Sequence, residues 1–453
     1  MKAEVPDAAG ALDLARAVRE GAVTATAVVQ ATLARIDARN PAVNAFTLVT
    51  RERALSRAAS LDLARASRAR LGPLAGVPFA VKAMIDIAGF TTTAGSALLR
   101  GAAPAVRDAA AVRQLEAAGA ICVGALNMDE FGLGGTTENA LFGPTRNPHD
   151  LSRTAGGSSG GSAAALAAGM VPLTLGGDAL GSIRLPASLC GVYGLRPTRG
   201  SVPDEGVLGS GGSLSTLGPL ARSVADLRAC HAVLTGTAPH HVAAGAEAPR
   251  LALAGGPLTE HLTADARDAL DPVARALGIA RSVEWPEPRR ARAAAMLVNC
   301  CESAAGKLSL LRERLHGFDP ATRDRFLAHA LLPVQWYLAA QRFRRWHADA
   351  VARLFRDVDV IVLPATPCVA PRLGQPTVRL DGADLPTGPA LGWFTQPIAG
   401  TDCPALAVPL ARPGRLPIGV QLVAAPGGES LLFAVAARLE AAGVVAAEPA
   451  VVA

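Results

Sequence analysis

The sequence predicts an α/β protein built on a large internal sheet, and three observations lead to this fold class. Half of the 453 residues are hydrophobic, only 18% are charged and the mean hydropathy is +0.29, a composition that excludes a disordered chain. Short apolar runs that favour buried strands alternate with helical stretches along most of the chain. No segment separates by composition as an independent unit, and no repeat of 20–50 residues is present.

The expected helices and strands follow one another along the whole chain. Strands or extended segments are expected at residues 45–49, 77–81, 121–125, 171–175, 251–253, 359–363 and 418–423. Helices are expected at residues 11–20, 24–39, 51–70, 109–118, 162–168, 221–234 and 263–277, with further helices filling 293–355. Residues 132–161 and 198–216 lack periodicity and are rich in Gly or Ser, and residues 236–250 are expected to form a surface linker.

Local signals set several of these boundaries. Gly21 is expected to end the first helix, and the hydroxyl of Thr24 can cap the start of the second. That second helix is expected to run to about Arg39, because Asn40-Pro41 is a typical stop. The aperiodic segment 132–161 is about thirty residues long, and such a segment inside a compact fold is usually functional.

Composition and charge also exclude several classes of protein. The formal net charge is +6, but the basic residues are spread along the chain and aromatic residues make up only 4%, so no nucleic-acid partner is expected. No run of 18 apolar residues lacks Pro, Gly or a charge, so no membrane span is expected. The eight histidines show no spacing typical of a metal site, so we expect no metal.

The cysteines and the N-terminus favour a cytoplasmic protein. There are seven Cys residues, an odd number without a CxxC motif, which predicts reduced thiols. The first six residues are polar and do not resemble a secretory signal.

Lysine is rare in this sequence. Only three of the 44 basic residues are lysines, namely Lys2, Lys82 and Lys307. Arginine therefore serves wherever a plain positive charge suffices, and a lysine at the end of the apolar run 77–81 suggests a need for lysine itself. Lysine differs from arginine in that burial can readily make it neutral.

The segment from Gly156 to Ser162, with the sequence Gly-Gly-Ser-Ser-Gly-Gly-Ser, leaves three alternatives open. It could cradle a phosphate at a helix N-terminus, although the Gly-Lys-Ser/Thr of a Walker loop is absent. It could form a nucleophile elbow, although the preceding residues favour a loop rather than the required strand. It could also place serine hydroxyls in a buried site. A flexible linker is disfavoured because a helix and a strand follow at once.

A second glycine-rich turn, residues 176–186, follows the strand expected at 171–175 and contains Ser182. Backbone N–H groups on such a turn can converge on one point, as an oxyanion hole requires.

Two serines and one lysine, at positions 82, 158 and 182, resemble the Ser–cis-Ser–Lys triad of the amidase signature family in type and spacing. The stretches that carry the resemblance are Gly76–Gly89, Ala155–Gly169 and Leu175–Thr198. The resemblance implies one domain over residues 1–453, a large α/β/α sandwich around a mixed, mostly parallel central sheet. Within it, residues 1–70 would form an N-terminal helical part, 71–235 the catalytic core, and 236–453 the part that shapes the pocket and completes the sheet.

The resemblance also implies roles for individual residues and no cofactor. Ser182 would be the nucleophile, and Ser158, joined to Gly157 by a cis peptide bond, would relay protons to a neutral, buried Lys82. The N–H groups of Ala179, Leu180, Gly181 and Ser182 would hold the oxyanion. The backbone of Gly132 would face the scissile group, while Asp178 and Arg184 would brace the turn.

One position departs from the family pattern. Most members have Gly at position 180 and a close branch has Asn, whereas this chain has Leu180. If that position needs a positive φ, leucine would be strained there. Either the turn uses a negative φ, or the chain is a catalytically weakened amidase-like scaffold.

Within the family, the resemblance favours the branch of the 1-carboxybiuret hydrolase catalytic subunits. The stretches that carry it are Leu126–Asp150, Leu332–Arg345, Leu363–Pro371 and Thr395–Pro404. This branch implies hydrolysis of a C–N bond in a small carboxylated urea with release of ammonia. Arg344 is the candidate that would bind the carboxylate.

The alternative function is that of the glutaminase subunit of a Glu-tRNA(Gln) amidotransferase. Those subunits carry an acidic residue for the ammonium group of glutamine, and Gly392 stands at that place here. The resemblance further implies a homodimer core and, as a possible partner, a small helical accessory subunit.

Overall fold

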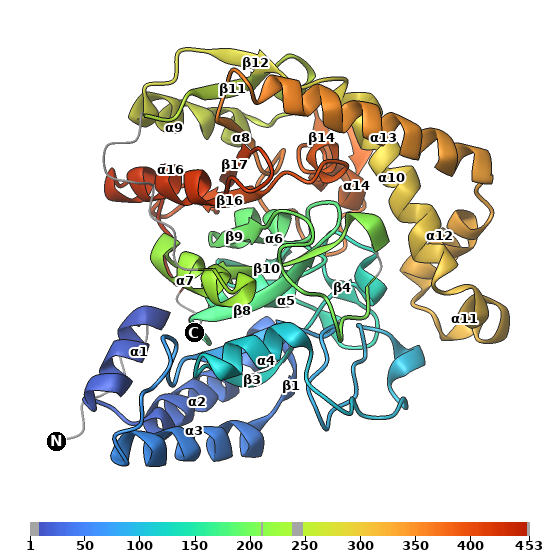
Figure 1. Ribbon diagram of the computed structural model, residues 1–453. Helices are drawn as coiled ribbons and strands as arrows, with labels where there is room; N and C mark the ends of the chain where they lie inside the picture. The colour runs from blue at the N-terminus through green and yellow to red at the C-terminus, as the bar shows by residue number, and fades with distance from the viewer. Residues whose placement is uncertain (1–8, 210–211, 238–247, 451–453) are drawn as a thin grey trace.

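An eleven-stranded sheet runs through the middle of the molecule and is flanked by helices (Figure 1). The computed structural model describes residues 9–209, 212–237 and 248–450. The order of the strands in the sheet is β1-β3-β2-β8-β10-β9-β16-β17-β13-β11-β12. The first half of the chain therefore supplies the strands from β1 to β9 in this order, and the second half supplies those from β16 to β12. Strands β9 and β16, which are far apart in the sequence, are neighbours in the sheet.

The strands of the large sheet are mostly short. They are β1 (Phe46–Val49), β2 (Pro78–Lys82), β3 (Ile121–Leu126), β8 (Leu173–Asp178), β9 (Tyr193–Arg196), β10 (Thr216–Ala221), β11 (Leu251–Gly255), β12 (Ser282–Glu284), β13 (Val360–Pro364), β16 (Ala405–Pro409) and β17 (Gly419–Ala424). Three two-stranded sheets join β4 (Glu138–Asn139) to β5 (Gly143–Pro144), β6 (Arg146–Asn147) to β7 (Asp150–Thr154), and β14 (Thr377–Leu380) to β15 (Ala383–Pro386).

The helices lie between these strands along the chain. They are α1 (Ala11–Glu20), α2 (Ala25–Val43), α3 (Arg51–Ala66), α4 (Ala110–Ala117), α5 (Gly160–Ala167), α6 (Arg184–Cys190), α7 (Val224–Thr235), α8 (Ala264–Asp268), α9 (Leu270–Leu277), α10 (Pro288–Ala305), α11 (Leu308–Glu313), α12 (Pro320–Ala330), α13 (Val334–Leu354), α14 (Thr387–Leu391), α15 (Gln396–Ala399) and α16 (Glu429–Ala441). Short 3-10 turns add η1 (Ala97–Leu99), η2 (Glu130–Gly132), η3 (Gly212–Leu214), η4 (Gly256–Thr259) and η5 (Leu315–Gly317).

The α/β class and the mixed sheet are as predicted, but the expectation of a mostly parallel sheet is wrong. Six of the ten neighbouring strand pairs are antiparallel, including the central run from β8 to β13. The parallel pairs are β2 with β3 and β8, and β11 with β12 and β13. A sequential pair with a short connection, such as β16 and β17, can pair only antiparallel, because a parallel crossover needs a longer connection.

Both faces of the sheet are covered by apolar packing. Along β2, Phe79 and Val81 belong to one buried cluster, whereas Ala80 belongs to another that includes α2 and α5 residues. Successive side chains of a strand point to opposite faces, so the two clusters lie on the two sides of the sheet. Lys82 follows Ala80 in this alternation and therefore belongs to the face that α5 covers.

The second helix extends past its expected stop. Thr24 caps α2 as predicted, since its Oγ1 accepts a hydrogen bond of 3.1 Å from the N–H of Ala27. The helix nevertheless continues through Pro41 to Val43, because a proline in the last turn removes only one of the final hydrogen bonds. Asn44 ends the helix, and Oδ1 of Asn40 accepts hydrogen bonds from the N–H groups of Ala45 and Phe46, which follow it.

Strands β9, β10 and β16 have no counterpart among the expected strands. They are short and contain Gly or Pro, which weakens the apolar signal of a strand. Because β10 includes Ala221, helix α7 starts three residues later than expected, where Ser223 caps it. The expected linker 236–250 falls largely outside the described residues.

Helix α5 approaches the end of β3 closely because it begins with glycine. A Cβ on Gly161 would lie 2.6 Å from both the backbone N and O of Asn127, and 2.7 Å from the carbonyl oxygen of Ala45. The Gly161 N–H also donates to the Asn127 carbonyl at 3.1 Å. The glycine therefore sets the distance between α5 and the sheet.

We predict that Gly161→Ala lowers the free energy of unfolding by about 1–3 kcal/mol, because backbone atoms cannot move aside for the added methyl group. Urea denaturation of the variant and the wild type measures this difference. Gly101→Ala is the matched control, since a Cβ there meets open space, and it should change stability by less than about 0.5 kcal/mol. Equal effects of the two substitutions would contradict the close approach of α5.

Candidate active site

The three residues of the proposed triad come from three segments that meet at one edge of the sheet. Lys82 ends β2, Ser158 lies in the loop before α5, and Ser182 lies in the turn between β8 and α6. Strands β2 and β8 pair in parallel, with Val81 opposite Leu175, so their carboxyl ends lie at the same edge. The topology therefore brings the lysine and the second serine to the same region.

Lys82 is fully enclosed by protein. Its side chain is 1% exposed, and Nζ lies 2.7 Å from Oγ of Ser158. Burial lowers the pKa of Lys82 from 10.5 to about 7, and the charges of Asp129 and Asp178 keep the pKa from falling further. The amine can thus be neutral near pH 7, as the sequence predicts.

Ser158 is held in a loop with an unusual backbone. The Gly157–Ser158 peptide bond is cis, as the family resemblance implies, and Ser158 is 1% exposed. Gly157 has no room for a side chain, because a Cβ would lie 2.3 Å from Oδ2 of Asp129. The next residue connects this loop to the turn that contains Ser182, since the N–H of Ser159 donates to the carbonyl of Ser182 at 3.2 Å.

The turn between β8 and α6 resolves the question raised by Leu180. Leu180 does not have a positive φ, whereas Gly181 adopts φ +127°. A Cβ on Gly181 would lie 2.2 Å from Oγ1 of Thr395, so this position accepts only glycine. The unusual leucine is therefore unstrained, and this reason for expecting weakened catalysis disappears.

Three of the four predicted oxyanion donors are free to bind a ligand. The N–H of Gly181 donates to Oδ1 of Asp178 at 2.8 Å, which corrects its predicted role. For the N–H groups of Ala179, Leu180 and Ser182, no hydrogen bond is found within the described part of the chain. These three groups are the candidates for stabilising negative charge on a substrate oxygen.

A buried cluster of charges holds this turn in place. Asp178, Arg184 and Arg196 are all 0% exposed. Both Asp178 carboxylate oxygens bind the Arg184 guanidinium, at 2.9 and 3.0 Å, and Arg196 donates to the Asp178 carbonyl at 2.7 Å. Burial alone would raise the pKa of Asp178, but the two arginines lower it to about 2. The predicted bracing role of Asp178 and Arg184 agrees with these contacts.

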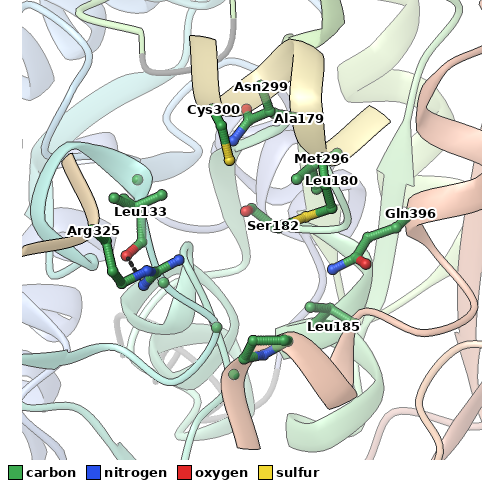
Figure 2. A pocket seen from close by; sticks show the side chains of 15 residues that line it. Leu133, Ala179, Leu180, Ser182, Leu185, Met296, Asn299, Cys300, Arg325 and Gln396 are labelled. Carbon is green, nitrogen blue, oxygen red and sulfur yellow. Dashed lines mark hydrogen bonds between the residues drawn. The ribbon is translucent and has the colours of Figure 1, made fainter. Parts of the chain in front are cut away.

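Ser182 opens into a small pocket. The pocket is lined by Gly132, Leu133, Gly134, Gly135, Ala179, Leu180, Ser182, Leu185, Met296, Asn299, Cys300, Arg325, Gly388, Pro389 and Gln396. Figure 2 shows the Ser182 hydroxyl between Arg325 on one side and Gln396 on the other, with Asn299 and Cys300 above it. Ser182 is partly exposed, and its hydroxyl has no hydrogen-bond partner within the described segments. Gly132 lies in the pocket wall, as predicted.

Arg344, the predicted carboxylate ligand, lies elsewhere. It does not line the pocket, and its guanidinium donates to the carbonyls of Gly400 and Ser213 and to the hydroxyl of Ser213, at 2.8–2.9 Å. The basic residue that lines the pocket is Arg325, on α12. Arg344 and Arg325 both lie on helices, and no sequence pattern tells which of the two faces the pocket.

The remaining polar groups of the pocket were not predicted from the sequence. Asn299 and Cys300 lie on α10, and Gln396 begins α15 inside the stretch 395–404. Cys300 contacts His329, with 3.1 Å between Sγ and Nε2, and burial raises the pKa of the Cys300 thiol to about 11. The lining includes no Asp and no Glu side chain. The pocket thus combines one cation with neutral amide groups.

The amidase family profile matches residues 27–253 and 291–433 of this chain. The chain belongs to the amidase signature family. Its large mixed sheet with flanking helices is the fold of this family. The chain is accordingly an enzyme that hydrolyses amide C–N bonds.

Several curated proteins and solved structures are similar over nearly the whole chain. AtzE, the 1-carboxybiuret hydrolase subunit of Pseudomonas sp. (strain ADP), is 44% identical, over 96% of this chain and 98% of that protein. The glutamyl-tRNA(Gln) amidotransferase of Anaeromyxobacter sp. (strain K) has a subunit that is 36% identical, over 92% of this chain and 93% of that one. An inhibitor-bound complex of an s-triazine catabolic enzyme, described as a vestigial protein complex, superimposes with a TM-score of 0.93 at 42% identity, covering 97% of this chain and all of that one.

Neither a metal-binding cluster nor a helix that could span a membrane is found in the described part of the chain. Within residues 9–209, 212–237 and 248–450, no group of His, Cys, Asp and Glu side chains is arranged to hold a metal ion. The same residues include no helix with the length and apolar character needed to span a membrane.

We predict that Asp178→Asn lowers the free energy of unfolding by about 3 kcal/mol, because it leaves two buried guanidinium groups without their carboxylate. Asp402→Asn is the control, since Asp402 pairs with Arg199 but is 46% exposed, and its loss should cost less than about 1 kcal/mol. Guanidinium chloride denaturation of both variants measures the difference. A similar small loss in both would contradict the bracing role of Asp178.

Proposed function

We propose that the enzyme hydrolyses the terminal C–N bond of a small carboxylated urea through an acyl-enzyme on Ser182, with release of ammonia. The observation that carries the proposal is the buried hydrogen bond of 2.7 Å between Lys82 and Ser158, beside a pocket that Ser182 faces. An amine with a pKa of about 7 can accept a proton at neutral pH and return it within the same cycle.

The proposed reaction has two stages. Neutral Lys82 takes the proton of the Ser158 hydroxyl, which in turn takes the proton of Ser182 as Oγ attacks the carbonyl carbon. The N–H groups of Ala179, Leu180 and Ser182 hold the oxyanion. The C–N bond then breaks, the relayed proton returns to the leaving nitrogen, and ammonia departs.

Deacylation uses the same groups in the same order. A water molecule gives one proton through Ser158 to Lys82 while its oxygen attacks the acyl carbon. The bond to Ser182 Oγ breaks, Oγ regains the proton, and the acyl group leaves as a carbamic acid. No cofactor enters either stage.

The charge of the pocket supports the choice of substrate. The pocket has an arginine and no carboxylate, which suits an anion and gives an ammonium group no partner. The similar 1-carboxybiuret hydrolase subunit carries in its name a substrate of this kind. Glutaminase activity, as in the amidotransferase relatives, is the alternative, and it is disfavoured because Gly392 packs against Gln396 where an acidic residue would be needed.

We also propose that the chain works in the cytoplasm as a homodimer with a small accessory subunit. All seven cysteines are free thiols, which suits a reducing compartment. The relative at 44% identity is named as one subunit of its enzyme, and the similar s-triazine enzyme was solved as a protein complex.

We predict that a fluorophosphonate labels Ser182 covalently and that Ser182→Ala abolishes both the labelling and the release of ammonia from 1-carboxybiuret. Intact-mass spectrometry, peptide mapping and an ammonia assay over biuret, 1-carboxybiuret, allophanate and glutamine make the test. Ser162→Ala is the control, because Ser162 lies in α5 and donates to the Leu175 carbonyl away from the pocket. Ammonia release from glutamine alone would contradict the proposed substrate, and labelling elsewhere would contradict the nucleophile.

We further predict that kcat/KM falls as the pH drops below about 7, because protonation of Lys82 removes the base. Asp129→Asn should move this acidic limb to lower pH, since the charge of Asp129 raises the pKa of Lys82. A pH–rate profile of both enzymes tests this. A limb that stays in place, or moves to higher pH, would argue against Lys82 as the titrating group.

A further inference from the structure

Arg325 contributes a positive charge to the pocket lining, and its side chain is exposed to solvent. It lies on α12, lines the same cavity as Ser182, and forms no ion pair within 4.0 Å among the described residues. Its one hydrogen bond runs from Nη1 to the carbonyl of Leu133, at 3.0 Å. That bond fixes the guanidinium beside the pocket wall and leaves the edge formed by Nε and Nη2 free. This edge matches the two oxygens of a carboxylate.

The other arginines near the site are already engaged. Arg184 is bound by Asp178, and Arg344 is bound by Ser213 and Gly400. Arg292 stacks on a tryptophan ring and donates to Oε1 of Gln396 rather than lining the cavity. Burial raises the pKa of Asp129, and the charge of Arg325 is one of the influences that lower it, although the two side chains form no ion pair.

Two amide side chains complete the polar lining. Asn299 is 6% exposed, and its Oδ1 is buried without a hydrogen-bond partner. Gln396 uses Oε1 to accept from Arg292, which leaves its Nε2 as the donor available to a ligand in the cavity. A urea can donate an N–H to Oδ1 of Asn299, and its carbonyl oxygen can accept a hydrogen bond from Nε2 of Gln396. An unpartnered buried oxygen is costly, so a ligand N–H that meets Asn299 would be favoured.

From this arrangement we propose that Arg325 is the carboxylate-binding residue of the site, with Asn299 and Gln396 binding the urea groups. The substrate then lies with its carboxylate toward α12 and its terminal carbamoyl carbon at Oγ of Ser182. The position of the cation therefore selects which C–N bond is broken, namely the one farthest from the carboxylate. This inference rests on the proposed function, and Figure 2 shows the arginine projecting toward Ser182 from the side opposite Gln396.

The test compares two ligands that differ only in the carboxylate, 1-carboxybiuret and biuret. In a Ser182→Ala background, which prevents turnover, calorimetry measures the Kd of each ligand with and without Arg325→Gln. Loss of a charge-assisted, two-point contact should weaken 1-carboxybiuret binding by about 10- to 100-fold and leave biuret binding within about twofold. Arg325→Lys should restore part of the loss, since it returns the charge without the fork.

Arg323→Gln is the matched control, because Arg323 lies on the same helix, pairs with Asp324 and does not line the pocket. It should bind both ligands as the parent does. Equal weakening of both ligands by Arg325→Gln, or no weakening of either, would overturn the inference. Fluorophosphonate labelling of the single variant Arg325→Gln shows whether the site still folds.

The two proposals fail in different ways. If the wild type releases ammonia from 1-carboxybiuret and Arg325→Gln leaves the preference over biuret unchanged, the carboxylate-binding role is wrong and the proposed function stands. If the wild type neither binds nor hydrolyses 1-carboxybiuret, the proposed function is wrong and the inference falls with it.

Discussion

The proposed chemistry of this site depends on the burial of one amine. Lys82 lies in the interior at the end of β2 and forms no ion pair among the described residues, so nothing close by fully compensates its charged form. Desolvation lowers its pKa to about 7, and two carboxylates, Asp129 and Asp178, limit the fall. A direct ion pair would keep the amine charged, and a fully apolar pocket would keep it neutral. With a pKa between these two extremes, the amine can accept a proton and also return it near pH 7.

The pKa of Lys82 stays near 7 because the two nearby carboxylates are bound to groups other than the amine. Asp178 gives both carboxylate oxygens to Arg184 and also binds the N–H of Gly181, so it shapes the turn and acts on Lys82 only from a distance. Asp129 is held by the N–H of Thr137, and burial raises its pKa to about 6. Gly157 lets its loop close over the Asp129 carboxylate, and Gly181, which has no room for a side chain beside Thr395, donates its N–H to Asp178. Burial, the two carboxylates and the backbone of these loops thus together set the pKa of the Lys82 amine.

The sequence was sufficient for the parts of the site that need unusual residues. Lys82 stood out because lysine is rare, and the serines stood out because each lies in a glycine-rich turn beside a helix or a strand. Gly181 was misassigned because its N–H has a partner, Asp178, that only the folded turn reveals. Arg325 was missed because neither its helix nor its neighbours carry a motif, and which side of α12 faces the pocket depends on tertiary packing. For the same reason, the antiparallel centre of the sheet could not be predicted from short strands such as β9.

The most direct measurement is the pKa of Lys82 itself, and the scarcity of lysine makes it practical. The chain has three lysines, so selective labelling with 13C- and 15N-lysine gives a very simple NMR spectrum, in which Lys82→Arg and Lys307→Arg assign two of the signals. We predict that the Lys82 signal titrates near pH 7, and that Lys307, buried against Phe131 and Phe326, titrates near pH 8. A Lys82 signal that titrates near the ordinary value of 10.5 would contradict the central claim.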